Sequence, residues 1–326
     1  MTEKKYLMST RREMLKLLAG TGVVSLGTQW TTPTAQAIDY DRPVSEADGL
    51  TAYCNSQQVL IRLDNCPIAA YRAHNTGKYP YLGSLAGPIT GTDLTTESAL
   101  PYPHHRGVWL GCDPLNGGDY WSDQSIGNGQ IRSTGVKAEK KSADCVVVND
   151  ACEWVGPNGS SPFKDERTLT VKSVTEHLRT IDVALKLTAC EDISIRSAKH
   201  SFFALRAAAD ISPSYGGTLM NSHGDVGAAA VHGKPAAWCS YFGPRRVRPD
   251  VVEGIALMDH PANPWSPCPW LARDYGHLSP SPFSFLKKPW RLEQGETIDL
   301  RYLIVVHAGD PQVAGLAQVY KNWISI

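Results

Sequence analysis

Residues 181–187 read Ile181-Asp182-Val183-Ala184-Leu185-Lys186-Leu187, so that large apolar side chains fall at every second position. Successive side chains of a β-strand point to opposite faces, and this alternation therefore predicts a strand with one buried face. The stretch 298–304, Ile-Asp-Leu-Arg-Tyr-Leu-Ile, repeats the pattern near the C-terminal end. We expect both stretches to be half-buried strands.

Shorter apolar runs predict further strands over residues 59–63, 145–148, 169–174, 202–205 and 254–258. Segments rich in Gly, Pro, Asn, Asp and Ser separate them, which is typical of an all-β sandwich or barrel. One helix is expected near the end, where four apolar residues share a helical face: Val313, Leu316, Tyr320 and Trp323. With no strand–helix alternation and no linker, residues 38–326 are expected to form a single, large antiparallel β-sandwich with a short C-terminal helix.

The composition excludes several classes of protein. The chain has 326 residues, of which 42% are hydrophobic, and 32 Lys and Arg balance 32 Asp and Glu. This apolar content excludes a disordered chain, and the charge balance argues against nucleic acid as a partner. No apolar run after the N-terminus reaches the roughly 18 residues of a membrane span. We therefore expect no integral membrane protein once a signal has been removed.

Residues 1–37 have the features of a twin-arginine export signal. Arg11-Arg12 precedes a mildly apolar stretch, 17–26, and Ala35-Gln36-Ala37 supplies a cleavage site. The alternative is an amphipathic first helix, which three glycines would weaken: Gly20, Gly22 and Gly27. The expected location is periplasmic or secreted. Twin-arginine export carries folded proteins, so it permits a cofactor without requiring one.

Eight cysteines follow the predicted signal: Cys54, Cys66, Cys112, Cys145, Cys152, Cys190, Cys239 and Cys268. An even number in an oxidising compartment allows disulfides, but the sequence does not indicate their pairing. The absence of a C-x-x-C motif argues against a structural zinc site or a thioredoxin-type site.

A first polar cluster begins at residues 101–113, Pro-Tyr-Pro-His-His-Arg-Gly-Val-Trp-Leu-Gly-Cys-Asp. His104 and His105 offer a general acid or base or a metal ligand, and Arg106 offers an anion clamp. On a strand the two imidazoles would point to opposite faces, so that one would face a given pocket. The alternative is a pair of structural histidines. Candidate substrate-binding residues in and after this run are Trp109, Asp113, Asn116, Asp119 and Trp121.

A second cluster covers residues 216–225, Gly-Gly-Thr-Leu-Met-Asn-Ser-His-Gly-Asp. Its glycines let the backbone approach a ligand closely, and Asn221 and His223 supply directional hydrogen bonds. A glycine-rich hairpin would explain the glycines equally well.

A third cluster runs from 259 to 277, where four prolines in nine residues favour a rigid extended loop. Trp265 and Trp270 could stack on a sugar ring, whose faces are apolar and whose rim is polar. Polar anchors for such a ring are Asp259, His260, Asn263, Arg273, Asp274 and Tyr275. Alternatively, the tryptophans only cover the end of the sandwich.

The runs Pro103-His104-His105-Arg106-Gly107-Val108-Trp109 and Asp259-His260-Pro261-x-Asn263-Pro264 resemble the exported bacterial proteins labelled "methane oxygenase PmoA". The motifs Asn116-Gly117-x-Asp119-x-Trp121 and Arg273-Asp274-Tyr275-Gly276 extend the resemblance over roughly residues 55–310. It implies a galactose-mutarotase-like super-sandwich and a role beside glycan-degrading systems. The label itself implies a membrane subunit, which the lack of spans contradicts, and we treat it as a mislabel.

Three functions are compatible with these observations. The first is an exported hydrolase or lyase acting on an oligosaccharide or polysaccharide. A hydrolase needs two carboxylates, for which Asp113, Asp119, Asp259 and Asp274 are candidates. A lyase would use His or Tyr as base, with Arg106 neutralising a uronate carboxylate. The expected catalytic residues are His104 or His105 as acid/base and Arg106 as anion clamp, with Asp259, His260 and Asp274 as partners.

The second function is non-catalytic glycan binding through the same loops, and the third is a periplasmic metalloprotein. No cofactor is firmly implied, but a divalent metal is allowed because several histidines could supply ligands: His104, His105, His200, His223 and His260. The common metal-binding spacings are absent, as is the G-x-S-x-G motif of serine hydrolases. The enzymatic and glycan-binding functions predict that the three clusters meet in one cleft.

Overall fold

The computed structural model describes residues 48–122, 126–285 and 288–325, which belong to one compact unit. The predicted export signal, residues 1–37, lies outside the described residues.

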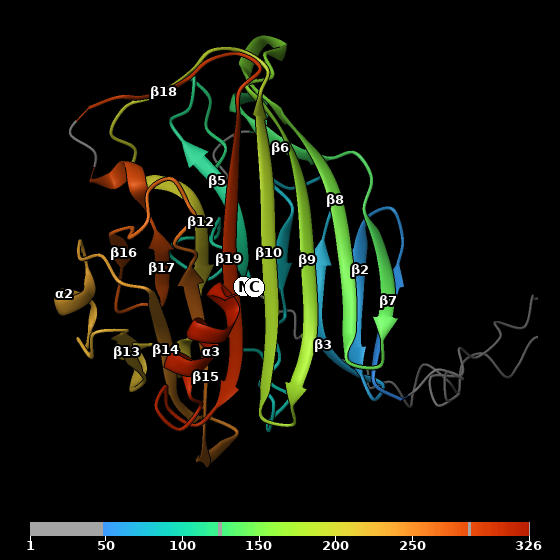
Figure 1. Ribbon diagram of the computed structural model, residues 1–326, viewed down its shortest axis with the longest axis vertical. Coiled ribbons are helices and arrows are strands. Elements are labelled where there is room, and N and C mark those ends of the chain that lie inside the picture. Colours follow the sequence, from blue (N-terminus) through green and yellow to red (C-terminus); the bar gives the residue numbers. More distant parts are fainter. Residues whose placement is uncertain (1–47, 123–125, 286–287, 326) are drawn as a thin grey trace, which may run out of the picture. The chain divides into compact units, whose positions relative to one another are not determined.

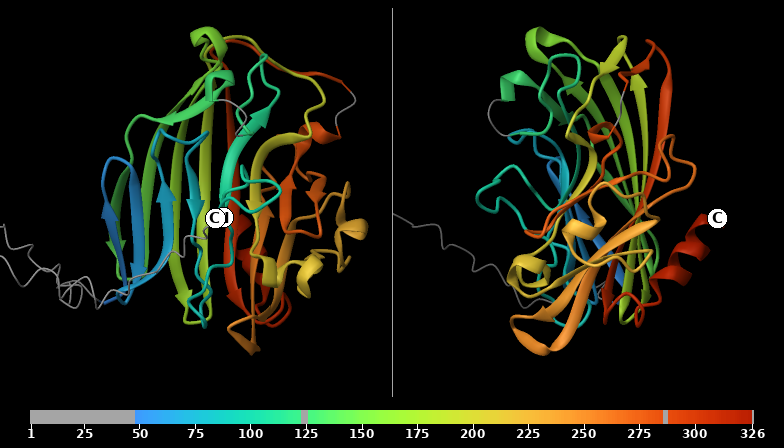
Figure 2. Two further views of the ribbon diagram at one scale, coloured as in Figure 1. Left: turned by 180° about the vertical axis from the view of Figure 1, so that it is seen from behind. Right: turned by 90° about the vertical axis from the view of Figure 1, so that its left-hand side faces the viewer.

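The described residues form two large antiparallel sheets that lie face to face (Figures 1 and 2). The eight-stranded sheet has the order β1 (Leu50–Cys54), β2 (Gln58–Leu63), β3 (Cys66–Arg72), β4 (Tyr81–Gly83), β5 (Val108–Asp113), β12 (His200–Arg206), β17 (His277–Pro280) and β16 (Trp270–Ala272).

The nine-stranded sheet has the order β13 (Thr218–Asn221), β14 (Trp238–Arg245), β15 (Arg248–Asp259), β19 (Thr297–Ala308), β10 (Leu178–Ala189), β9 (Phe163–Thr175), β8 (Cys145–Val155) and β6 (Gln130–Ser133), with β7 (Lys137–Ser142) also paired to β8. A two-stranded sheet joins β11 (Ile193–Ile195) to β18 (Trp290–Leu292). The helices are α2 (Ala228–Val231), α3 (Leu316–Ile324) and the short 3-10 turns Ile126–Asn128, Pro157–Gly159, Ala209–Ile211, Pro213–Tyr215 and Pro282–Ser284.

The alternating stretches of the sequence form the middle of the nine-stranded sheet. Strands β10 and β19 pair antiparallel, with Ile181 opposite Ile304 and Leu187 opposite Ile298. All four side chains are buried. The prediction of an antiparallel all-β fold with a short C-terminal helix is therefore confirmed.

An aromatic stack joins the two sheets in the core. The ring of Phe203 on β12 lies parallel to that of Tyr302 on β19, with centroids 4.5 Å apart. Arg206 comes three positions after Phe203 on the same strand, and side chains alternate along a strand. Arg206 therefore points away from the nine-stranded sheet.

Helix α3 packs on the nine-stranded sheet through Leu316 and Trp323, which join a buried cluster with residues of β14, β15 and β19 (Figure 1). Val313 was expected on the same face, but it precedes the helix and is 78% exposed. The helix begins after Gly315, so the apolar spacing in the sequence predicted a helix that starts about one turn too early.

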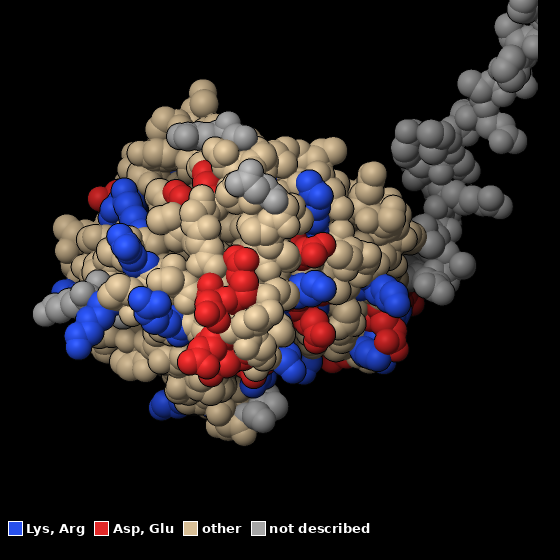
Figure 3. All heavy atoms as spheres, turned by 90° about the horizontal axis from the view of Figure 1, so that it is seen from above, with Lys and Arg blue, Asp and Glu red and all other residues tan. Residues whose placement is uncertain are grey.

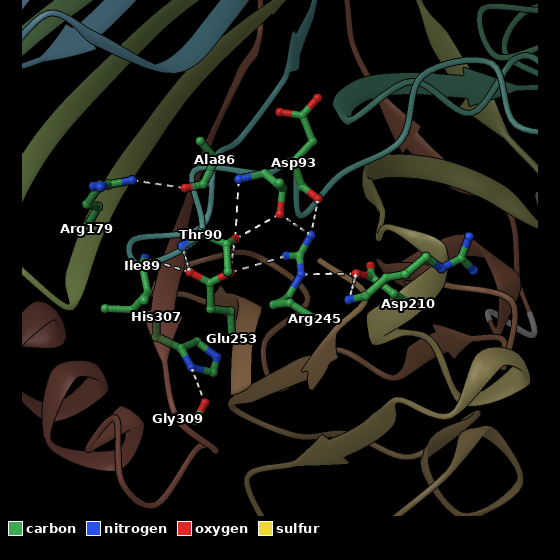
Figure 4. A network of polar contacts seen from close by, with 12 residues as sticks. Ala86, Ile89, Thr90, Asp93, Arg179, Asp210, Arg245, Glu253, His307 and Gly309 are labelled. Atoms are coloured by element: carbon green, nitrogen blue, oxygen red, sulfur yellow. Dashed lines mark hydrogen bonds and ion pairs between the residues drawn. The ribbon is translucent and has the colours of Figure 1, made fainter. Parts of the chain in front are cut away.

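The connection from β4 to β5 is anchored by a buried polar network (Figure 4). The carboxylate of Glu253, which is fully buried, accepts hydrogen bonds from the backbone N–H groups of Ile89 (2.6 Å) and Thr90 (2.9 Å). Arg245 donates to the carbonyl of Asp93 (2.8 Å) and to the carboxylate of Asp210 (3.1 Å). These bonds fix the connection to strands β14 and β15 of the nine-stranded sheet.

All eight cysteines are free thiols, so the structure contains none of the disulfides that an oxidising compartment would allow. None of the helices among the described residues is long and apolar enough to span a bilayer. Seen from above, acidic side chains gather in a stripe near the middle of the face, with basic side chains on either side (Figure 3).

Candidate functional site

A pocket of about 220 Å³ brings parts of two predicted clusters together. Its lining comes from the β4–β5 connection, the start of β12 and the β16–β17 hairpin: Tyr102, His104, His105, Lys199, His200, Leu271, Arg273, Tyr275 and His277. Four imidazoles, two tyrosines and two basic side chains therefore surround one space.

Both adjacent histidines line this pocket, contrary to the expectation that one would face it. That expectation assumed a strand, but β5 begins only at Val108, and His104 lies in a turn before it. The ring centroids of His104 and His105 are 4.6 Å apart, with the planes nearly perpendicular.

His105 is a buried, neutral hydrogen-bond donor. Its ring is 3% exposed and stacks on His277 (4.6 Å between centroids) and Trp109 (5.3 Å). Nη1 of Arg206 lies 3.3 Å from Nδ1 of His105. A guanidinium can only donate, so Nδ1 accepts and the ring proton resides on Nε2. Burial, together with the charges of His104, Arg206 and His200, lowers the pKa of His105 to about 2.

His277 lines the pocket with a buried ring nitrogen that has no partner in the described part of the chain. His277 is 2% exposed, and burial lowers its pKa well below the usual value. Its Nδ1 has no hydrogen-bond partner among the described residues. Trp109 and Trp121, which were expected to bind substrate, are buried and lie outside the pocket lining. Leaving a buried polar group unpaired costs about 1–3 kcal/mol. The unpaired Nδ1 therefore favours a polar ligand next to His277.

His200 lies beside a carboxylate at the edge of the pocket. Its Nδ1 lies 3.7 Å from Oδ2 of Asp113, and its ring stacks on Trp121 at 5.3 Å. The two residues are partners in register across β12 and β5. A carboxylate beside Nδ1 favours the tautomer that carries its proton there, which leaves the Nε2 lone pair to accept a proton.

Tyr275 can serve as a proton donor. It is half-buried, and Arg206 lies over its ring at 4.5 Å. Burial raises the pKa of Tyr275, and Tyr102 adds to this effect, while Arg206 and Arg273 oppose it. The phenol is therefore protonated at neutral pH.

Three polar residues of the first cluster lie outside the pocket lining. Arg106, the expected anion clamp, lies over the ring of Tyr81 at 5.9 Å. Asp119 accepts hydrogen bonds from the backbone of Trp121 and Ser122 and closes a turn. Asn116 donates to Glu191 and to the carbonyl of Asp192, which ties its turn to the segment before β11.

The second cluster does not reach the pocket. Oδ1 of Asn221 accepts hydrogen bonds from the backbone N–H groups of His223 and Asp225, both at 3.0 Å. The His223 side chain is exposed. The cluster therefore forms a turn after β13, as the hairpin alternative describes.

The third cluster is divided. Asp259 is 2% exposed and accepts hydrogen bonds from Asn263 (2.7 Å) and the backbone of Cys268 (3.3 Å). Burial raises the pKa of Asp259. His260 and Asn263 line a different groove, of about 380 Å³, over β9, β10 and β19.

Other members of this cluster contribute to packing. Trp265 stacks on Phe202 at 5.7 Å, and Trp270 is buried and donates to the carbonyl of Ala236. Asp274 accepts a hydrogen bond from the backbone of Ala228. Of the predicted third-cluster residues, Arg273 and Tyr275 line the pocket.

Lys199, Arg206 and His277 are not among the residues that the sequence predicts for the site, and His200 is predicted there only as a metal ligand. A charged residue at the end of the apolar run 202–205 was the available signal for Arg206. No group of three or more His, Cys, Asp or Glu side chains in the described ranges is arranged to hold a metal ion.

Solved structures match this chain at low sequence identity. The heparan sulfate lyase HepC from Pedobacter heparinus matches with a TM-score of 0.40 and 7% identity over 81% of this chain and 36% of that one. This chain thus spans about a third of the length of that lyase. A galactose mutarotase related enzyme from Lactobacillus acidophilus matches with a TM-score of 0.29 and 7% identity, over 79% of this chain and 97% of that one.

No curated protein matches the sequence significantly. The resemblance to the proteins labelled methane oxygenase PmoA stays a prediction. A family described as of unknown function, DUF6807, matches residues 58–321, and the chain belongs to this family.

Proposed function

We propose that the protein is a lyase that cleaves a uronate-containing polysaccharide by elimination. The observation that supports this most strongly is the lining of the pocket. It combines imidazole, phenol and basic side chains, and none of its described lining residues is a carboxylate. Such a pocket suits an anionic sugar, because Lys199 and Arg273 can pair with its carboxylate.

Hydrolysis has weaker support. It normally uses two carboxyl groups roughly 5 to 9.5 Å apart on either side of the glycosidic bond. Asp119, Asp259 and Asp274 are engaged in turns and loop contacts outside the pocket lining. Asp113 adjoins the pocket only through His200.

The proposed reaction assigns one proton transfer to each side of the broken bond. Nε2 of His200 removes the proton from C5 of the uronate, while its carboxylate is held by Arg273, Lys199 and the Nε2–H of His105. The electron pair forms a double bond between C4 and C5, and the bond from C4 to the glycosidic oxygen breaks. The Tyr275 hydroxyl gives its proton to that oxygen.

The test uses a panel of uronate-containing polysaccharides, with the ultraviolet absorbance of the unsaturated product as the readout. We expect His200→Asn to lower kcat about 10²- to 10⁴-fold, which is the usual contribution of a general base. The exposed His223→Asn is the matched control and should keep full activity. New reducing ends without absorbance would instead indicate a hydrolase. Binding without any product would indicate a glycan-binding protein.

We also infer that the protein acts outside the cytoplasm, where polysaccharides are available to it. The twin-arginine pattern at Arg11 and Arg12 supports this location. Replacing both with lysine should retain the protein in the cytoplasmic fraction. Export that persists in this variant would contradict the inference.

A further inference from the structure

A second pocket adjoins the first. It has a volume of about 270 Å³ and is lined by Ser197, Lys199, His232, Leu271, Arg273, Ser284 and Phe285. Lys199, Leu271 and Arg273 line both pockets, so these three side chains form the wall between them. A ligand that fills the first pocket therefore has a second hollow next to it.

His232 presents a hydrogen-bond donor in this second pocket. Its Nδ1 lies 3.2 Å from Nη1 of Arg273 and accepts a longer bond (3.4 Å) from the backbone N–H of Ala272. Because Nδ1 accepts, the proton of the neutral ring is on Nε2. Burial and the charges of Arg273 and Lys199 lower the pKa of His232, which keeps the ring neutral.

Phe285 gives the second pocket an apolar face. It is 37% exposed, which is a large fraction for an aromatic side chain, and it meets His232 edge to face at 5.6 Å. An exposed aromatic ring beside hydroxyl, imidazole and basic groups suits a sugar ring with an acidic substituent. The described lining of this pocket also contains no carboxylate that would repel such a group.

We propose that the two pockets form one cleft that binds at least two consecutive sugar residues, both of which carry acidic groups. This inference rests on the proposed function for the first pocket. The neighbouring residue of the chain stacks on Phe285, and its carboxylate or sulfate pairs with Lys199, Arg273 and Nε2–H of His232. Basic side chains in the shared wall serve both residues, so the cleft selects a polymer with closely spaced negative charges.

The test uses calorimetry to compare a methyl uronoside, which can fill only the first pocket, with a disaccharide of two uronate residues, which can fill both. It is done in the His200→Asn background so that turnover does not interfere. The measured quantity is the ratio of the two dissociation constants. We expect the disaccharide to bind at least about tenfold more tightly than the monosaccharide, since tenfold corresponds to only 1.4 kcal/mol of added contacts. Phe285→Ala and His232→Ala should each reduce this preference to about twofold.

Tyr53→Ala is the matched control, because Tyr53 is an aromatic residue of equal exposure (38%) on β1, outside both pockets. It should leave the ratio unchanged. A ratio that stays high in both cleft variants, with binding intact, would overturn the second pocket but not the lyase proposal. If the protein that carries only His200→Asn binds neither saccharide, both proposals fail. Repeating the titration with a disaccharide that carries a sulfate in place of the second carboxylate distinguishes sulfate from carboxylate as the preferred group.

Discussion

Replacing Glu253 with glutamine is expected to lower the free energy of unfolding by about 3–5 kcal/mol, the usual cost of breaking a buried ion pair. The Glu253 carboxylate is fully buried and accepts three hydrogen bonds, from Ile89 N–H, Thr90 N–H and Thr90 Oγ1, at 2.6 to 2.9 Å (Figure 4). It also lies 3.6 Å from Nη1 of Arg245. Glutamine keeps the shape but removes the charge, so Arg245, at 3% exposed, retains only Asp210 as an ionic partner.

Urea unfolding followed by tryptophan fluorescence measures this loss. The matched control is Glu166→Gln, because Glu166 is exposed on β9 and its substitution should change stability by less than about 0.5 kcal/mol. A domain of this kind has about 5–15 kcal/mol of total stability, so the expected loss is easily resolved. If Glu253→Gln costs less than about 1 kcal/mol, the network does not anchor the β4–β5 connection in the way described.

Three further outcomes are expected. Burial lowers the pKa of His307 from 6.5 to about 4. Between these two pH values the unfolded chain is protonated at His307 and the folded chain is not. The contribution of His307 to the free energy of unfolding is fully present above pH 6.5, and about 3 kcal/mol of it is lost by pH 4. The variant His307→Gln should therefore show a smaller difference between the free energies of unfolding at these two pH values than the unaltered protein. Tyr275→Phe should lower kcat about 10²- to 10⁴-fold with little change in KM, and full retention of kcat would exclude the phenol as the acid. Asp182 accepts two hydrogen bonds from Arg301 and one from the indole of Trp323; Asp182→Asn should cost about 1–2 kcal/mol in thermal or urea unfolding, and no loss would mean that apolar contacts alone hold α3.

The fold was predictable from the sequence because strand alternation is a local property. The pattern at 181–187 and 298–304 follows from one buried face, and it identifies β10 and β19 without knowledge of their partners. The candidate site was less predictable, because it depends on which sheet each strand joins. Strand β15 ends at Asp259 in the nine-stranded sheet, whereas β16 begins at Trp270 in the eight-stranded sheet.

The third cluster therefore spans a crossing between the sheets. His260 and Asn263 lie over the nine-stranded sheet, whereas Arg273 and Tyr275 line the pocket beside the eight-stranded sheet. Proximity in the sequence suggested one loop with one role, but long-range pairing separated its two halves. The same pairing placed His200 beside Asp113, residues that are far apart in the chain.

The free thiols differ in their accessibility to reagents. Burial raises the pKa of Cys112, Cys152, Cys239 and Cys268, and the thiolate is the reactive form. Cys54 and Cys66 are exposed, on strands β1 and β3. A maleimide dye in water will therefore attach first to these two strands, outside the linings of both pockets, and can report on saccharide binding without occupying the cleft.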